Sequence, residues 1–135
     1  MTALKSNSNT VWFNFQTYIH IYIYIITGIS EHVIKLQKNY QAIVQKMYTT
    51  TTITDQLVSS QALNLEEMQE VCVPGLTHEE SNRRLIVKLV YKPPEAFHIF
   101  LQSLRKDDCY KEIVEDIDKT VISSDDIHML QIGNL

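Results

Sequence analysis

The sequence contains little glycine, proline and cysteine, and each shortage excludes a class of protein. Three glycines among 135 residues are too few for the tight turns of a hairpin-rich all-β fold, which need positive φ angles. The same shortage leaves no glycine-rich loop that could hold a nucleotide phosphate. Cys72 and Cys109 are too few for a disulfide scaffold and form no C-x-x-C motif. We therefore interpret them as reduced thiols of a cytoplasmic protein.

A strong net charge is also missing. Twelve Lys and Arg residues against sixteen Asp and Glu residues give a net charge of -4, which provides no general affinity for nucleic acid or an anionic membrane. The length leaves room for one domain with one core, and 44% hydrophobic with 21% charged residues is ordinary for a soluble globular chain. Electrostatic recognition must therefore come from local patches.

Residues 1–29 differ in composition from the rest of the chain. The segment "VWFNFQTYIHIYIYIITGI" is rich in aromatic and β-branched residues, which favour strands. Asn14, Gln16 and His20 interrupt the run of about 20 apolar residues that a membrane span requires, and no signal-peptide cleavage pattern follows. Ile-Tyr-Ile-Tyr-Ile is also what an alternating T-A nucleotide repeat encodes. We predict that this extension does not belong to the fold.

From Ser30 onward, apolar residues recur at helical spacing. One face of the first predicted helix carries Val33, Leu36, Tyr40, Ile43 and Met47. The threonines of Tyr48–Thr52 are poor helix formers and are expected to interrupt the pattern. A short helix then follows, ending at about residues 59–61.

Polar residues mark the starts of the later helices. Asn64 with Glu67, and Thr77 with Glu80, have the spacing of capping boxes. Either Asp107 or Asp108 is predicted to cap the last helix. These signals predict six helices between Ser30 and Asp118.

Pro93 and Pro94 are predicted to form a tight corner between two helices. Pro93 disfavours helical backbone at Lys92, while Pro94 suits the first position of the next helix. The corner folds the following helix back against the preceding one. The predicted core residues are Leu85, Leu89, Phe97, Phe100, Leu104, Ile113 and Ile117. We predict an all-α, six-helix antiparallel bundle with a single core.

Motifs for catalysis, cofactor binding and metal binding are absent. Cys72, His78, His98 and Cys109 show none of the paired spacings of a zinc site. No G-x-S-x-G, phosphate-binding loop or H-E-x-x-H occurs. Cys109, at a helix start, is expected to have a slightly lowered pKa, but no base is marked beside it. We expect no catalytic, cofactor-binding or metal-binding residues and no enzymatic activity.

Charged side chains separate by helix. The first and fourth predicted helices carry the basic residues Lys35, Lys38, Arg83, Arg84 and Lys88, and the second and third carry the acidic residues Asp55, Glu66, Glu67 and Glu70. Any single charge is most simply a solvated surface residue. The separation, however, is typical of a domain that stacks on copies of itself or on a relative. We predict that the two sets are a basic and an acidic partner-binding face. The alternative for either arginine alone is an ion pair with Glu79 or Glu80.

The segment "SNRRLIVKLVYKPPEAFHIFLQSLRKDDCYKEIVEDI" resembles the fourth to sixth helices of caspase recruitment domains of the death-fold superfamily. Lys92–Phe97 matches the corner of that family, and Leu57–Val71 looks like its second-to-third helix passage. The resemblance covers Ser30 to Asp118, and "RRLIVKL" is most similar to initiator-caspase prodomains. Two departures occur: the family usually has Gly where Pro93 stands, and Met47–Asp55 is weak where the family has a firm helix junction.

The resemblance implies a death-fold domain over residues 30–118, with residues 1–29 an extension and 119–135 a linker-like tail. It implies a cytoplasmic, homotypic protein–protein interaction module that regulates apoptosis or caspase activation. Such a module is an adaptor, a decoy or the prodomain fragment of an initiator caspase, and no Q-A-C-x-G protease motif is present. The implied partner is another domain of this family, in an apoptosome adaptor or an initiator caspase, with self-association as a second mode.

A small helical DNA-binding or transcriptional domain is the alternative, because short helices with tight corners also build helix-turn-helix folds. The net acidity disfavours it, as does the lack of a recognition helix rich in Asn, Gln and Arg. We therefore expect neither nucleic acid nor a membrane as partner.

Overall fold

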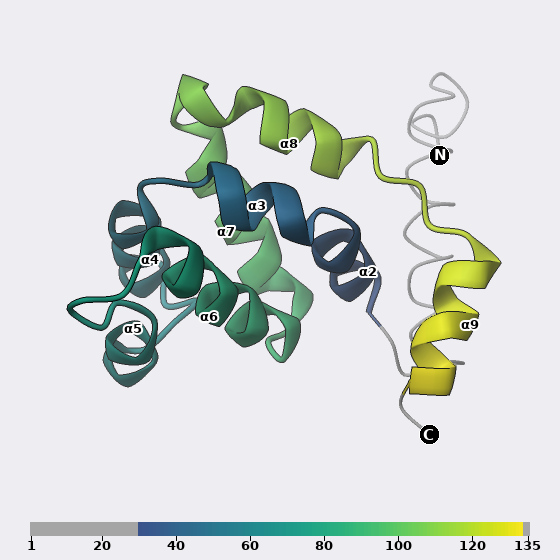
Figure 1. Ribbon diagram of the computed structural model, residues 1–135, viewed down its shortest axis with the longest axis horizontal. Helices are drawn as coiled ribbons and strands as arrows, with labels where there is room; N and C mark the ends of the chain where they lie inside the picture. The colour runs from purple at the N-terminus through teal and green to yellow at the C-terminus, as the bar shows by residue number, and fades with distance from the viewer. Residues whose placement is uncertain (1–29, 134–135) are drawn as a thin grey trace, which may run out of the picture. The chain divides into compact units, whose positions relative to one another are not determined.

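A computed structural model describes residues 30–133 of the chain (Figure 1). This part contains eight α-helices and one 3₁₀ helix, with no strand. They are α2 (Glu31–Lys38), α3 (Tyr40–Lys46), α4 (Thr50–Ser59), α5 (Leu65–Val71), α6 (His78–Val90), α7 (Pro94–Arg105), η2 (Asp108–Tyr110), α8 (Lys111–Asp118) and α9 (Ser124–Gly133). The all-α prediction is confirmed. The predicted extension, residues 1–29, lies outside the described residues.

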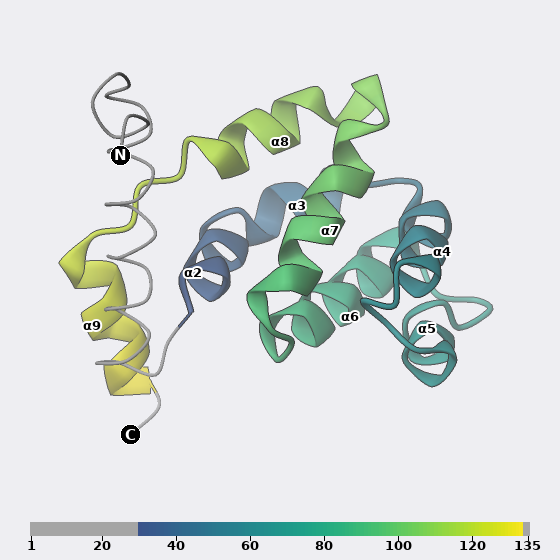
Figure 2. The same ribbon diagram turned by 180° about the vertical axis from the view of Figure 1, so that it is seen from behind.

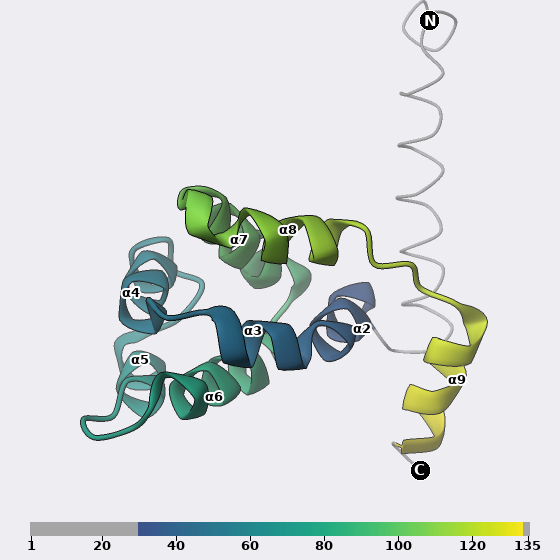
Figure 3. The same cartoon turned by 45° about the horizontal axis from the view of Figure 1, so that its top comes forward.

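Helices α2 to α8 belong to one compact unit, His32–Val121. Within it, α3 packs against α6, α4 against α7, and α5 against α6. Figure 2 shows α7 crossing the bundle with α4 to one side of it, and Figure 3 shows α3 lying beside α6 with α8 next to α7. The core of this unit contains all seven residues that the sequence analysis placed there, and each of them is buried.

Helix α9 belongs to a separate unit. Ser123 and Asp126 form reciprocal bonds at its start: the Ser123 N–H donates to Asp126 Oδ2 at 2.8 Å, and the Asp126 N–H donates to Ser123 Oγ at 3.2 Å. The tail expected to be linker-like therefore contains a capped helix. The predicted division of the chain at residues 29 and 118 stays a prediction.

The first predicted helix is divided at Asn39, which separates α2 from α3. The side-chain Nδ2 of Asn39 donates to the Lys35 carbonyl and to Thr120 Oγ1, both at 2.8 Å. Local side-chain bonds of this kind compete with helical backbone bonds. The first predicted helix is thus interrupted at this residue, and its two parts, α2 and α3, together with α4 to α8 correspond to the six predicted helices.

The predicted interruption by threonines is confined to residues 47–49, because Thr50 to Thr52 form the first turn of α4. Thr50 and Thr54 are buried. The Thr50 hydroxyl donates to Asn82 Oδ1, and the Thr54 hydroxyl donates to the Thr50 carbonyl at 2.7 Å. The predicted interruption is therefore confirmed at Tyr48 and Thr49. It is wrong at Thr50 to Thr52, where the buried hydroxyl bonds offset the low helix propensity of threonine.

Asn82 of α6 fixes the end of α3. It is fully buried, and its Nδ2 donates to the Met47 carbonyl at 2.7 Å and to the Val44 carbonyl at 2.9 Å. Carbonyls at the end of a helix lack backbone partners within the helix. One amide side chain therefore satisfies two of them and, through Thr50, also anchors the start of α4.

Tyr110 fixes the same corner from the other side of the unit. Its ring is buried, and its hydroxyl accepts hydrogen bonds from the N–H groups of Tyr48 at 3.1 Å and Thr49 at 2.8 Å. These N–H groups precede α4, where orphan donors need partners. The α3–α4 corner is thus held by two buried, uncharged side chains distant in sequence.

The predicted helix starts are confirmed in most details. Asn64 and Glu67 form a complete capping box, with bonds of 2.8 and 3.0 Å. Thr77 accepts a bond from the Glu80 N–H at 3.2 Å. Asp107 caps the 3₁₀ turn η2, which leads directly into α8.

The predicted proline corner is confirmed as well. Tyr91 is the C-cap of α6, Pro93 the N-cap of α7, and Pro94 its first residue. Phe97, on the first turns of α7, is buried in the core. The two prolines therefore direct α7 onto the bundle, as the sequence predicts.

Candidate interaction surface

Among residues 30–133, no group of three or more His, Cys, Asp or Glu side chains lies close enough to hold a metal ion. None of the helices there combines the length and apolar character that a membrane crossing needs.

Cys109 is an exposed thiol without the character of a nucleophile. A hydrogen bond to the Asp107 side chain, followed by the negative charge of that carboxylate, raises the pKa of Cys109 above its ordinary value. The expectation of a lowered pKa is wrong, because these carboxylates outweigh the helix start. A raised pKa keeps the residue as the less reactive thiol.

Arg83 and Arg84 of α6 both contact Glu80 one turn earlier. Arg83 Nη1 lies 3.3 Å from Glu80 Oε2, and Arg84 Nε lies 3.7 Å from Glu80 Oε1. Arg84 Nη1 also donates to the Glu70 carbonyl at 3.0 Å. The alternative of an ion pair within the domain therefore holds for both arginines. Because these pairs are exposed, each contributes little to stability, on the order of 0.5 kcal/mol.

Two lysines at the end of α6 and beyond it pair with α5. Lys88 Nζ pairs with the Glu70 carboxylate, and Lys92 Nζ lies 2.7 Å from Glu67 Oε1. The acidic and basic sets therefore meet at the contact between α5 and α6 inside one copy of the chain. Lys88, Glu67 and Glu70 are neighbours in this structure rather than members of separate surfaces.

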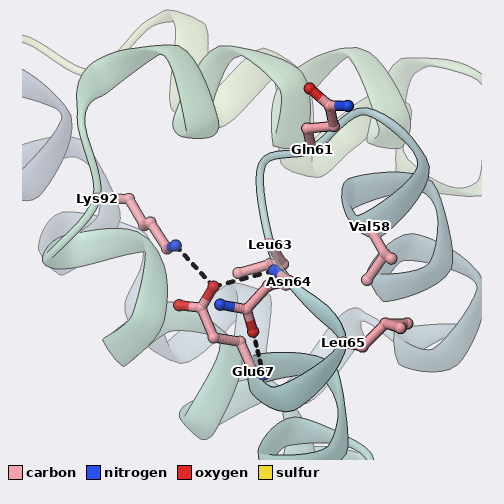
Figure 4. A pocket seen from close by; sticks show the side chains of 7 residues that line it. All are labelled: Val58, Gln61, Leu63, Asn64, Leu65, Glu67 and Lys92. Carbon is pink, nitrogen blue, oxygen red and sulfur yellow. Dashed lines mark hydrogen bonds and ion pairs between the residues drawn. The ribbon is translucent and has the colours of Figure 1, made fainter.

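The Lys92–Glu67 pair is the least exposed of these contacts. Burial raises the pKa of the Glu67 carboxyl, but its bonds to Lys92 and to the Asn64 N–H outweigh that effect, so the pKa lies below its ordinary value. Figure 4 shows the Glu67 carboxylate between Lys92 and the backbone of Asn64. Glu67 is thus committed to holding α5 in place.

The same pair borders an open hollow of about 550 Å³ between the end of α4 and the start of α5 (Figure 4). Gln61 lies on its rim with φ of 64°, the left-handed conformation that often ends a helix. The hollow is lined by Val58, Gln61, Leu63, Asn64, Leu65, Glu67 and Lys92. It combines apolar walls with a few polar groups.

The remaining predicted site residues lie apart from this contact. Asp55 on α4 and Glu66 on α5 are exposed, and the side chain of neither makes an ion pair or a hydrogen bond with another residue of the described part. Lys35 and Lys38 are on α2, and Lys38 Nζ donates to the Val121 carbonyl at 3.0 Å. Of the predicted acidic set, Asp55 and Glu66 are therefore the residues whose carboxylates are available to a partner.

Sequence reasoning missed the exposed apolar residues of this region. Tyr91 is 86% exposed and Val87 is 52% exposed, and Leu65 at the first position of α5 is 64% exposed. Arg83, Val87 and Tyr91 are spaced four residues apart, so they share the outer side of α6. Val87 and Tyr91 lie off the spacing of the core residues Leu85 and Leu89, which is the signal that could have identified them.

Comparison with known proteins identifies the family. The model of the caspase recruitment domain family matches residues 34–120, a span that runs from within α2 through α8. No curated protein and no solved structure gives a significant match. The all-α bundle and this match over more than half of the chain agree, and the chain belongs to the caspase recruitment domain family, whose members are homotypic protein-interaction modules of apoptosis and inflammation signalling.

Proposed function

We propose that this chain is a non-catalytic recruitment module that binds another caspase recruitment domain in the cytoplasm. It acts as an adaptor or decoy, or as the prodomain of an initiator caspase, and its partner belongs to an apoptosome adaptor or an initiator caspase. The observation that carries the proposal is the family match over residues 34–120. The likeness of "RRLIVKL" to initiator-caspase prodomains supports the assignment to apoptosis.

The outer side of α6 is the basic surface that we assign to the partner. Arg83 and Arg84 are held only by exposed pairs with Glu80 and by one bond to a backbone carbonyl, so a partner carboxylate can replace Glu80 at small cost. Arginine presents a planar fork to carboxylates and is enriched at interface hot spots. We assign Lys88 of α6, and Lys35 and Lys38 on α2, to the same basic face.

The second surface that we assign to partner binding is the acidic set of this chain. Within the predicted acidic set, Glu67 and Glu70 are engaged by Lys92 and Lys88. Asp55 and Glu66 are exposed, and they supply the charge that a basic partner meets. Within the predicted acidic face, Asp55 and Glu66 are therefore the residues that we assign to the contact, since Glu67 and Glu70 are engaged by lysines of the same chain.

Charge reversal tests the basic surface. In the Arg83→Glu, Arg84→Glu double variant, binding to purified recruitment domains of initiator caspases and apoptosome adaptors should fall at least tenfold, because like charges then meet at the contact. Biolayer interferometry measures the binding, and circular dichroism checks that the helices remain. The melting point should change only slightly, since the lost pairs with Glu80 are exposed.

A matched control separates this surface from net charge. Lys106 and Lys111 are also exposed, and Lys106→Glu with Lys111→Glu changes the total charge by the same amount. The control should bind like the unmodified chain. Full-strength binding by the Arg83→Glu, Arg84→Glu variant, or an equal loss in the control, would remove α6 as the contact.

A further inference from the structure

The tyrosines of the described part of the chain differ in whether an enzyme can reach their hydroxyl groups. Tyr110 is buried, and its hydroxyl accepts a bond from the N–H of Tyr48. The ring of Tyr48 lies against that of His78, with 4.6 Å between the centroids, and Tyr40 is 37% exposed within α3. Tyr91 is 86% exposed, and its side chain makes no hydrogen bond or ring contact with another described residue. Of these hydroxyl groups, that of Tyr91 is therefore the most accessible.

The backbone at Tyr91 has left the helix. α6 ends at Val90, Tyr91 is its C-cap, and no residue of the stretch 91–93 is helical. Pro93 has φ of -58° and ψ of 158°, which is the extended polyproline II conformation. Tyrosine kinases bind their substrates as extended segments, and some prefer an aliphatic residue directly before the tyrosine and a proline three positions after it. Val90 and Pro94 occupy these two positions, so the segment combines accessibility with the pattern of a kinase substrate.

We propose that Tyr91 is a phosphorylation site, with ATP and a tyrosine kinase as the reagents. The phenolic oxygen of Tyr91 attacks the γ-phosphorus of ATP, and a new O–P bond forms as the bond to the β,γ-bridging oxygen breaks. ADP leaves with the electron pair of that bond, and the phenolic proton passes to the catalytic base of the kinase. Only the effect on partner binding rests on the proposed function, which the modification deepens by adding a means of regulation.

Lys88 is the charged side chain best placed to meet the phosphate. It precedes Tyr91 by three positions at the end of the same helix, so the two side chains are neighbours on its surface. Phosphotyrosine carries a charge of about -1.5 to -2 and three strong acceptor oxygens, whereas the present partner of Lys88 is the single carboxylate of Glu70. Lys92 is held in the less exposed pair with Glu67. The phosphate therefore draws Lys88 away from Glu70 and releases one of the ion pairs between α5 and α6.

The modification also changes the side of α6 that we assign to the partner. Arg83 lies about 12 Å before Tyr91 along the helix axis, which exceeds the screening length of about 8 Å at physiological salt. The phosphate therefore acts little on Arg83 itself. It neutralises Lys88, however, and it repels the carboxylates that a partner brings to this side of α6. Binding through the basic surface should fall by about threefold, because the exposed pairs at stake are weak.

Phosphorylation of the full chain tests the site. The probe is ATP with the purified catalytic domain of a non-receptor tyrosine kinase of the stated preference, and mass spectrometry locates the phosphate and measures its rate of incorporation. Tyr91 should be modified at least tenfold faster than Tyr40 or Tyr48. Pro94→Ala should slow the modification of Tyr91 several-fold, whereas Pro74→Ala, the matched control outside the segment, should not. A rate at Tyr91 no higher than that at Tyr40 or Tyr48 would overturn the proposal.

The phosphorylated chain tests the consequence. The NMR signals of the Lys88 side chain should shift on phosphorylation, and those of Lys106, the C-cap of α7, should not. Biolayer interferometry should show about threefold weaker binding to purified recruitment domains, and a tyrosine phosphatase should restore it. Unshifted Lys88 signals or undiminished binding would overturn the assigned regulation.

The two readouts separate this proposal from the proposed function. If Tyr91 is phosphorylated and the Lys88 signals shift, yet neither form of the chain binds a recruitment domain, the proposed function fails and the phosphorylation site stands. If Tyr91 resists phosphorylation and the chain still binds recruitment domains, the site fails and the proposed function stands.

Discussion

The α3–α4 corner and the α5–α6 surface hold their helices by opposite means. At the corner, Asn82 and Tyr110 are buried and uncharged, and each satisfies several backbone or hydroxyl groups. At the surface, Lys88 and Lys92 pair with Glu70 and Glu67, and Arg83 and Arg84 pair with Glu80. Removing a partner from a buried bond strands a polar group away from water, whereas water and salt replace an exposed one. The buried bonds of the α3–α4 corner therefore stabilise the fold. The charged side chains of the α5–α6 surface can exchange their ion pairs within the chain for ion pairs with a partner.

The largest loss of stability is expected from a substitution in the hydrophobic core, beyond either of these regions. Phe97 on α7 is among the largest fully enclosed side chains. Phe97→Ala should lower the free energy of unfolding by about 3–5 kcal/mol, because it removes apolar contacts and leaves a cavity. Urea denaturation followed by circular dichroism measures the loss. An unchanged midpoint would mean that α7 does not pack as described.

A break at the corner should have the next largest effect. Asn82→Ala removes the donor to the Met47 and Val44 carbonyls and the acceptor for the Thr50 hydroxyl. We expect a loss of about 2–3 kcal/mol, because buried polar groups are left unsatisfied. Gln102→Ala, at an exposed position of the same bundle, is the control and should change stability by less than about 0.5 kcal/mol. Equal melting points for the two variants would refute the structural role of Asn82.

A buried histidine should make the bundle sensitive to pH. Burial lowers the pKa of His32 below 6.5, although its Nε2–H bond to the Leu89 carbonyl at 3.1 Å opposes the shift. The folded state therefore disfavours the charged ring. The neutral ring contributes fully to the stability of the folded state above about pH 6.5. This contribution is lost as the pH falls from there toward the lower pKa of His32 in the folded state.

Melting curves between about pH 7.5 and pH 5 check this prediction. The unmodified chain should lose stability more steeply on acidification than His32→Gln, whose remaining slope reports the rest of the chain. Identical slopes would show that the ring of His32 titrates normally.

The smallest effect is expected at the α5–α6 surface. Glu70→Gln removes the pair with Lys88 but should cost less than about 1 kcal/mol, and high salt should reduce that cost further. Denaturation at low and high salt measures it, with Glu95→Gln at an exposed position of α7 as the control. A cost as large as that of Asn82→Ala would erase the distinction between corner and surface.

The sequence predicts most of the bundle because its signals are local. Apolar spacing identifies the core residues Leu85 to Ile117, and the Asn64–Glu67 box and the proline corner mark helix ends by rules that involve a few neighbours. The division at Asn39 and the threonine turn of α4 could not be predicted in this way. They depend on Thr120 and Asn82, which lie 81 and 32 residues away in sequence.

The candidate surface, too, could be predicted from the sequence only where its signals are local. Helix by helix, charge patterning separates Glu67 and Glu70 from Lys88, yet antiparallel packing of α5 on α6 brings them together. The pattern therefore predicts which residues are charged and on which helix they lie. Which of them remain available, chiefly Asp55 and Glu66, depends on packing that no single helix encodes.

Charge exchange between two copies tests the central claim that the basic surface of α6 meets the acidic surface of a recruitment domain. One copy carries Arg83→Glu and Arg84→Glu, and the other carries Asp55→Arg and Glu66→Arg, positions chosen because Glu67 is engaged in its own capping box. Isothermal dilution should show that each variant associates with itself only weakly, because one surface of every contact is then repulsive. Titration should show that the two variants bind each other several-fold more tightly, because the unaltered acidic surface of the first copy meets the unaltered basic surface of the second. No recovery in the exchanged pair would contradict the account.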